Sequence, residues 1–213
     1  MGHAAMAETA VRYLRSARGP GAVGRPRART PGASPGTSPG GPVMDPGEFR
    51  RVLGCFPSGV TVVTAHDEDG PAGFACQSFA SLSLDPPLVV FLVGRTSATW
   101  PRIARAGAFC VNVLGAEQGA LCMGFAASGA DGRDKFAGVA YRASPATGSP
   151  LLAGVVAWVD CEVHAVHTGG DHLIVVGRAL TLGTPPGAPA APLLFHGGAL
   201  RGLPPAKISP SGA

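Results

Sequence analysis

The chain of 213 residues contains 32 glycines and 21 prolines, a proportion that excludes a coiled coil or a bundle of long helices. Its 46% hydrophobic and 14% charged residues are typical of a soluble domain with a sizeable core, and no apolar run approaches the length of about 20 residues that a membrane span needs. The first 43 residues hold six arginines against one acid, whereas the rest hold eleven Lys and Arg against twelve Asp and Glu, so we expect no nucleic-acid-binding surface on the folded part.

The N-terminal segment differs in composition from the rest of the chain. Residues 16–42 contain thirteen Gly or Pro, and Val23 is their one large aliphatic side chain. Such a segment cannot bury enough apolar surface to offset its loss of conformational entropy. We therefore predict a disordered basic Gly/Pro-rich leader over residues 1–43, one folded domain over 44–203 and a disordered tail over 204–213. The leader is expected to be dispensable, with Met44 as an alternative start.

The folded part opens with a helix signature. Asp45 is suited to the N-cap, Pro46 to the first helical position, and Glu48 follows three residues after the cap. Apolar residues then recur with helical spacing at Phe49, Val52, Leu53 and Phe56. A short amphipathic helix is expected to end near residues 57–59.

Apolar, β-branched runs separated by turn residues predict strands after this helix. Residues 60–66 and 72–78 flank a polar turn and predict a hairpin. Further strands are expected at residues 88–93, 109–114, 155–164, 172–182 and 193–196, with helices inserted near 99–106 and 116–126. This order predicts a mainly β domain with inserted helices, an antiparallel barrel and not a doubly wound sheet. Residues 127–150 form a long Gly-, Ser- and Pro-rich connection, a kind that is usually functional or mobile.

Several kinds of chemistry are disfavoured by the residues present. His164 and His167 are three apart, which on a regular strand places them on opposite faces, and we expect no metal site. The part of the sequence expected to fold, residues 44–203, has no G-x-S-x-G motif of a nucleophilic hydrolase. The five cysteines lack a C-x-x-C pair, and we interpret them as reduced core residues of a cytoplasmic protein: Cys55, Cys76, Cys110, Cys122 and Cys161.

Two polar runs interrupt the apolar pattern. The first contains Gln77, Ser78, Ser81 and Ser83, whose short donors and acceptors suit the edge of a flat heteroaromatic ligand. The alternative is a strand end followed by a serine-rich turn, and physical reasoning alone favours that alternative. The second run, GRTSAT at residues 94–99, either holds a phosphate or supplies an ordinary helix cap through Ser97 or Thr99.

Six motifs together resemble one known family. They are FPSGVTVVT at residues 56–64, GFACQSF at 73–79, SLSLDPPL at 81–88, FCVNVL at 109–114, DKFAG at 134–138 and GGDH at 169–172. In this order they are similar to the flavin reductase domain with the FMN-binding split-barrel fold, over residues 45–203. Within the family, the 73–79 string most resembles the reductase component of a two-component monooxygenase that hydroxylates a secosteroid phenol.

The resemblance implies a homodimeric enzyme that uses NADH or NADPH to reduce FMN or FAD and releases the reduced flavin to a separate monooxygenase. Hydride would pass directly between the stacked rings, so no catalytic carboxylate is required. The implied flavin-contacting residues are Ala75, Cys76, Gln77, Ser78, Gly94, Ser97, Ala98, Thr99 and Phe125. The implied nicotinamide side consists of His172, as the catalytic residue, with Phe195, His196, Gly197 and Gly198.

The strongest alternative is a split-barrel module that binds flavin without reducing it. The segments 169–172 and 195–198 separate the two hypotheses, because a pure binder does not need a nicotinamide side. By its shape alone, the 169–172 segment favours a plain hairpin turn over a nicotinamide site. Relatives often have an arginine where this chain has Gly124, a difference that predicts weaker flavin binding.

Overall fold

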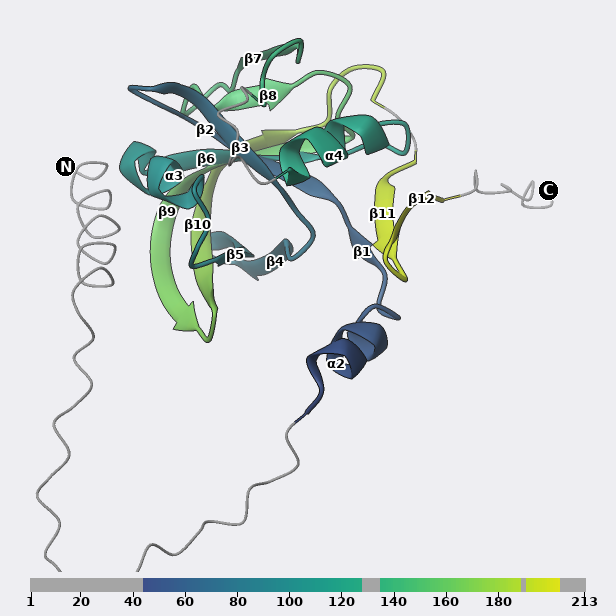
Figure 1. Cartoon of the computed structure of the whole chain (residues 1–213). Coiled ribbons are helices and arrows are strands. Elements are labelled where there is room, and N and C mark those ends of the chain that lie inside the picture. Colours follow the sequence, from purple (N-terminus) through teal and green to yellow (C-terminus); the bar gives the residue numbers. More distant parts are fainter. Residues whose placement is uncertain (1–43, 128–134, 189–190, 204–213) are drawn as a thin grey trace, which may run out of the picture.

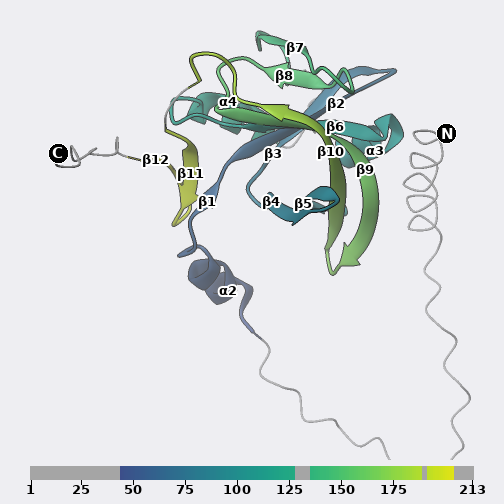
Figure 2. The same cartoon turned by 180° about the vertical axis from the view of Figure 1, so that it is seen from behind.

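A computed structural model of the protein describes residues 44–127, 135–188 and 191–203 (Figures 1 and 2). The predictions for the leader, for residues 204–213 and for Asp134 lie outside this part of the chain. Within it, every named strand pair is antiparallel, and the helices are inserted between strands. The predicted mainly β architecture is confirmed.

The three described helices are α2 (Pro46–Leu53), α3 (Trp100–Ala106) and α4 (Gly119–Ala126). The strands are β1 (Ser58–Gly59), β2 (Thr61–Asp67), β3 (Gly70–Cys76), β4 (Ala80–Leu84), β5 (Pro87–Gly94), β6 (Ala108–Val113), β7 (Tyr141–Ala143), β8 (Pro150–Leu152), β9 (Ala157–Gly169), β10 (His172–Gly183), β11 (Leu193–His196) and β12 (Ala199–Gly202). The expected hairpin is β2–β3. Strand β4 was expected to be a turn, and it forms a strand because its backbone pairs with β5.

The main sheet has seven strands in the order β3-β2-β6-β9-β10-β5-β4 and curls strongly through the long strands β9 and β10 (Figure 1). Its two ends approach each other where β3 ends. There the Ser78 hydroxyl accepts a hydrogen bond from the Leu92 amide (3.0 Å) and donates one to the Leu92 carbonyl (3.1 Å). One side chain thus takes the place of a strand partner beside β5, and the sheet forms a split barrel.

Two apolar clusters fill the domain. The larger cluster lies inside the curled sheet around Phe91, Phe109 and Trp100, whose rings pack edge-on, with centroids 5.2 Å apart for the two phenylalanines. Gly177 permits this packing, because a Cβ atom there would lie 2.3 Å from the Phe109 ring. The second cluster packs α4 against the sheet and includes Phe125. Strand β2 is buried along Thr61–Ala65 because both of its faces are covered.

Helix α2 and the small sheet β1-β11-β12 stand apart from the barrel (Figures 1 and 2). The predicted cap is confirmed, because the Asp45 carboxylate accepts a 2.7 Å bond from the Glu48 amide. None of the α2 residues is buried. The interpretation of the cysteines as core residues is therefore wrong for Cys55, which follows this helix and is exposed, whereas the other four are buried and all five are free.

The connection over residues 127–150 is more regular than its composition indicated. Its described part contains β7, which pairs with β8. Two buried side chains hold this hairpin to the sheet: the Asn112 carboxamide accepts from the Leu152 amide (2.8 Å), and the Asp160 carboxylate accepts from the amides of Ala146 (2.8 Å) and Thr147 (3.0 Å). Such long-range contacts order a Gly- and Ser-rich segment that has little apolar content of its own.

The prediction that His164 and His167 lie on opposite faces of a strand is wrong. In the β9–β10 ladder, Gly177 pairs with Val163 but Val176 pairs with Ala165, so His164 has no partner on β10. This bulge shifts the alternation of side chains between the two faces of β9 by one residue. Val163 is buried and Val166 packs on the same core, so both histidines lie on the outer face, where they are exposed. Within the described part of the chain, no group of three or more metal-ligating side chains is present, and no helix is long and apolar enough to cross a membrane.

Candidate functional site

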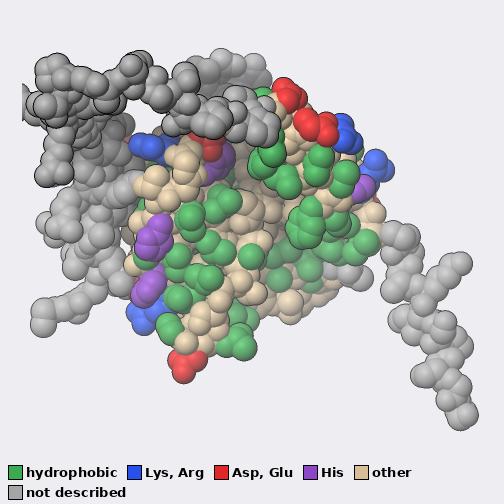
Figure 3. All heavy atoms as spheres, turned by 90° about the horizontal axis from the view of Figure 1, so that it is seen from below, with side chains coloured by type: hydrophobic (Ala, Val, Ile, Leu, Met, Phe, Trp, Pro, Cys, Tyr) green, Lys and Arg blue, Asp and Glu red, His purple; other side chains and the backbone are tan. Residues whose placement is uncertain are grey.

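A cleft of about 1210 Å³ opens where the two ends of the curled sheet meet. Its walls come from α2, the end of β3, the end of β5 with the following loop, the end of α4, and the tip of the β9–β10 hairpin. The space-filling view from below shows a hollowed face with hydrophobic side chains gathered around it (Figure 3). Ten of the predicted site residues line this cleft: Ala75, Cys76, Gln77, Ser78, Gly94, Ser97, Ala98, Thr99, Phe125 and His172.

The β3 wall is held by its own polar groups. The Ser78 hydroxyl is bonded to the Leu92 backbone and lies 3.3 Å from the Cys76 sulfur. Burial raises the pKa of the Cys76 thiol, so this sulfur stays protonated at neutral pH. The Gln77 carboxamide accepts a long 3.4 Å bond from the Ser58 hydroxyl of β1. Of the first polar run, Gln77 and Ser78 line the cleft, whereas Ser81 and Ser83 of β4 do not.

The second polar run forms the loop between β5 and α3. Ser97 caps the helix, because its hydroxyl accepts a 3.2 Å bond from the Trp100 amide, whereas Thr99 makes no such side-chain bond. The capping alternative is therefore right for Ser97. Arg95 is exposed and outside the cleft lining, and its amide donates to the Asp171 carbonyl (3.0 Å).

His172 lies directly opposite Gly94 in the β10–β5 ladder. It follows a tight turn in which Gly170 has a φ of +68°, a conformation that favours glycine. Its Nδ1 lies 2.8 Å from the Asp171 carboxylate. This hydrogen bond lowers the pKa of Asp171, so the carboxylate accepts and Nδ1 carries the proton. The segment is a hairpin turn and a wall of the cleft at the same time.

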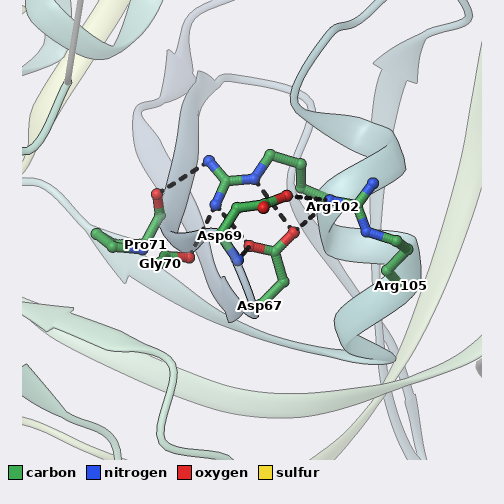
Figure 4. A network of polar contacts seen from close by, with 6 residues as sticks. All are labelled: Asp67, Asp69, Gly70, Pro71, Arg102 and Arg105. Carbon is green, nitrogen blue, oxygen red and sulfur yellow. Dashed lines mark hydrogen bonds and ion pairs between the residues drawn. The ribbon is translucent and has the colours of Figure 1, made fainter.

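An ion-pair network fixes the helix that follows the 94–99 loop (Figure 4). Arg102 of α3 donates to the Asp67 carboxylate (2.5 and 3.2 Å) and to the carbonyls of Gly70 (2.9 Å) and Pro71 (3.2 Å), at the β2–β3 turn. Arg105 adds a 2.7 Å bond to Asp67. These bonds lower the pKa of the Asp67 carboxyl, with the Arg102 hydrogen bond as the largest cause.

Lys135 is a cleft residue that the site prediction omitted, although the DKFAG motif contains it. Its ammonium donates to the Phe125 carbonyl at the end of α4 (3.0 Å), and partial burial lowers its pKa. Helix α2 adds Phe49, Arg50 and Leu53, which a sequence pattern alone could not assign to a cleft. The lining therefore includes two cations, Arg50 and Lys135, and among the described residues it includes no Asp or Glu.

The remaining predicted segment lies elsewhere. Phe195, His196, Gly197 and Gly198 are not part of the cleft lining. They form the end of β11 and its turn, where Phe195 pairs with Ser58 and the Gly197 amide donates to the Gly54 carbonyl just after α2 (2.9 Å). Within one chain, the structure therefore separates the segment from His172.

Comparison with known proteins places this geometry in a family. The family described as "Flavin reductase like domain" matches residues 53–204. The reductase subunit HsaB of a flavin-dependent monooxygenase from Rhodococcus jostii (strain RHA1) is 48% identical over 168 residues, which cover 79% of this chain and 83% of that protein.

Two solved structures extend the similarity to the fold. Nitrilotriacetate monooxygenase component B from Mycobacterium thermoresistibile has a TM-score of 0.71 at 46% identity, covering 78% of this chain and 90% of that one. The NADH:FAD oxidoreductase SgcE6 of Streptomyces globisporus, in complex with NAD and FAD fragments, has a TM-score of 0.69 at 37% identity, covering 78% and 98%. Sequence motifs, topology and comparisons agree, and the chain belongs to the flavin reductase-like domain family.

Proposed function

We propose that this protein is an NAD(P)H-dependent flavin reductase that reduces FMN or FAD and supplies the reduced flavin to a separate monooxygenase. One observation carries the proposal: ten residues that the family resemblance implies as contacts of flavin or nicotinamide, from β3, β5, α4, the β9–β10 hairpin and the loops that follow β3 and β5, line a single cleft. The names of the relatives, which include a monooxygenase reductase subunit and an NADH:FAD oxidoreductase, support the same activity.

The properties of the cleft fit the two ligands. Sites for one drug-sized molecule usually occupy about 300–1,000 Å³, so a volume of about 1210 Å³ has room for two ring systems together. Arg50 and Lys135 supply positive charge for phosphate groups, and among the described lining residues no carboxylate opposes them. The loop around Ser97 and Thr99 adds hydroxyls for the same purpose.

The chemistry needs alignment more than acid and base groups. When the two ligands are bound together, a hydride moves from C4 of the nicotinamide to N5 of the flavin, giving the oxidised nicotinamide and reduced flavin. The chain's residues hold the reacting rings and exclude water. Phe125 and the Ala75–Ser78 wall bound the flavin side, and His172, fixed through Nδ1 by Asp171, presents its remaining ring nitrogen to the nicotinamide carboxamide.

The proposal includes a homodimer. Helix α2 has eight residues with none buried, and Phe56 beyond it is 78% exposed. An isolated helix of this length has little stability of its own, so its apolar face requires a cover. A second copy of the chain supplies one, and the adjoining 195–198 turn then lies at the interface. The five free cysteines further support a reducing, cytoplasmic location.

The test is the steady-state oxidation of NADH and of NADPH in the presence of FMN, FAD or riboflavin. We expect at least one pair to turn over far above the flavin-free rate, and reduced flavin to leave the protein and sustain a separate monooxygenase. Binding of flavin without any nicotinamide oxidation would instead establish the flavin-binding module. Absence of both binding and oxidation would reject both functions.

A further inference from the structure

Helix α2 forms one wall of the cleft with three neighbouring side chains. Phe49, Arg50 and Leu53 line the cleft, whereas Arg51 and Val52 do not. Phe49 and Leu53 are one helical turn apart and Arg50 lies beside them, so this face combines an aromatic ring, an aliphatic side chain and a cation. The three residues are exposed, and they belong to none of the segments expected to contact the isoalloxazine or the nicotinamide.

The two consecutive arginines of α2 differ in their partners. Arg51 donates two hydrogen bonds to the Glu48 carboxylate (2.7 and 2.8 Å), so its charge is balanced on the helix itself. The Arg50 guanidinium makes no ion pair with any residue that the structure describes, and the described lining of the cleft contains no Asp or Glu. Arg50 is therefore a cation of the cleft that is available to an anionic ligand.

The groups on α2 match the part of FAD that FMN lacks. FMN ends in one phosphate group, for which the cleft already offers Lys135 and the hydroxyls of the 94–99 loop. FAD continues through a second phosphate into an adenosine. A guanidinium binds a phosphate through paired, charge-assisted hydrogen bonds, and a base stacks on an aromatic ring. Arg50 and Phe49 supply these two groups side by side.

The bonds around α2 favour a flavin over NADH as the source of this adenylyl group. Shortly after α2, the Ser58 hydroxyl donates to the Gln77 carboxamide of the flavin wall (3.4 Å). The Gly197 amide also reaches the end of α2, at the Gly54 carbonyl (2.9 Å), but its segment lies outside the cleft lining, whereas Gln77 is part of it. Within the cleft of one chain, α2 thus adjoins the flavin wall.

We propose that α2 binds the adenylyl half of FAD, with Phe49 against the adenine ring and Arg50 on the phosphate nearer to the adenosine. The inference rests on the proposed function and deepens it, because it names FAD, in preference to FMN, as the flavin that the cleft binds more tightly. Leu53 adds apolar surface beside the ring. Val52 and Phe56, which lie outside the cleft lining, remain for contact with a second copy of the chain.

The test compares Arg50→Gln with Arg51→Gln. The Kd values for FMN and for FAD are measured by isothermal titration calorimetry without nicotinamide. We expect wild type to bind FAD about tenfold more tightly than FMN, and Arg50→Gln to raise the Kd for FAD about tenfold while changing the Kd for FMN less than about twofold. Arg51→Gln, the matched control outside the cleft lining, should change neither. Phe49→Leu, which keeps an apolar side chain but removes the ring, should raise the Kd for FAD about fivefold.

A second measurement separates FAD from NADH as the occupant. The KM for NADH and for reduced nicotinamide mononucleotide, which lacks the adenylyl group, is determined with FMN as acceptor. If Arg50→Gln raises the KM for NADH alone and leaves the Kd for FAD unchanged, α2 binds the adenylyl group of NADH and the inference is overturned.

Three further outcomes decide between the inference and the proposed function. Equal wild-type affinities for FMN and FAD would overturn the inference alone. Equal losses of FAD affinity in the two arginine variants would do the same, because they would report a general disturbance of α2 and not a phosphate contact. A wild-type protein that binds neither flavin would overturn the proposed function itself.

Discussion

His172 and Ser78 both line the cleft, but their polar atoms are engaged differently. The Ser78 hydroxyl uses both its proton and an acceptor lone pair on the Leu92 backbone. His172 uses only Nδ1, in its contact with Asp171. Ser78 is therefore primarily a residue that shapes the cleft, whereas His172 retains a ring nitrogen for a ligand.

Replacing His172 by alanine is expected to impair nicotinamide binding. The His172→Ala variant loses the contact to the carboxamide, so its KM for NADH or NADPH should rise about tenfold, while the flavin Kd stays nearly constant. Steady-state kinetics and flavin titration measure the two quantities. His167→Ala is the matched control, because His167 lies on the outer face of β9, outside the cleft lining. An unchanged KM in His172→Ala would remove this residue from the site.

Replacing Ser78 by alanine tests its structural role. The variant leaves the Leu92 amide and carbonyl without their side-chain partner, and the free energy of unfolding should fall by about 1 kcal/mol. Denaturant titration measures this loss, and Ser78→Thr, which keeps the hydroxyl, should recover most of it. Ser81→Ala on the exposed β4 serves as control. A bulky Ser78→Leu side chain would both obstruct flavin and break these bonds, so loss of flavin binding in that variant does not by itself locate the ring.

At the level of elements, helix α3 connects the loop of residues 94–99, which lines the cleft, with the β2–β3 turn. The loop 94–99 enters α3, and Arg102 and Arg105 attach that helix to Asp67, whose side chain is only 4% exposed. A single carboxylate thus receives two guanidinium groups. The position of the loop depends on a charge network that lies outside the cleft lining.

The Asp67→Asn variant should show a pH-dependent loss of stability. Because the arginines lower the pKa of Asp67 in the folded state, the carboxylate stabilises the fold above its unfolded pKa, near pH 4, and this stabilisation is lost as the pH falls through the folded pKa. We expect wild type to exceed the variant by about 2 kcal/mol at neutral pH and the difference to shrink below about pH 4. Denaturant titrations at a series of pH values measure it, with Glu68→Gln as control. A pH-independent difference would contradict the ion-pair explanation.

For the whole molecule, the exposed apolar surface is the feature that one chain leaves unexplained. Phe49, Val52 and Leu53 of α2 are each at least half exposed, and Phe56 is more so. Helix α2 also forms one wall of the cleft through Arg50. A second copy of the chain that covers α2 would therefore stabilise this helix and also fix the position of the cleft wall that the helix forms.

The Phe56→Ser variant should weaken this association. Burial of a phenylalanine contributes about 1.5–3 kcal/mol, and a two-fold interface loses it twice, so the dimer Kd should rise about a hundredfold or more. Sedimentation velocity at several concentrations measures the change against the chain mass of 21.3 kDa. Met123→Ser is the control, since Met123 is 62% exposed on α4, away from α2 (Figure 1). A wild-type protein that is monomeric at micromolar concentration would contradict the dimer.

The sequence by itself determined those features that depend on neighbouring residues. The Asp45 cap, the β2–β3 hairpin and the order of strands and helices follow from local turn chemistry and hydrophobic period, which act over a few residues. The motif order was sufficient to identify the family and ten of the residues that line the cleft.

Only the tertiary structure decided how these parts meet. The bulge beside Gly177 placed two histidines on the same face of β9, pairing across the sheet placed Gly94 opposite His172, and Lys135 reached the cleft by bonding to Phe125. Register and packing depend on residues far apart in the chain, because each contact must satisfy hydrogen bonds and volume simultaneously on several strands. No local pattern contains that information.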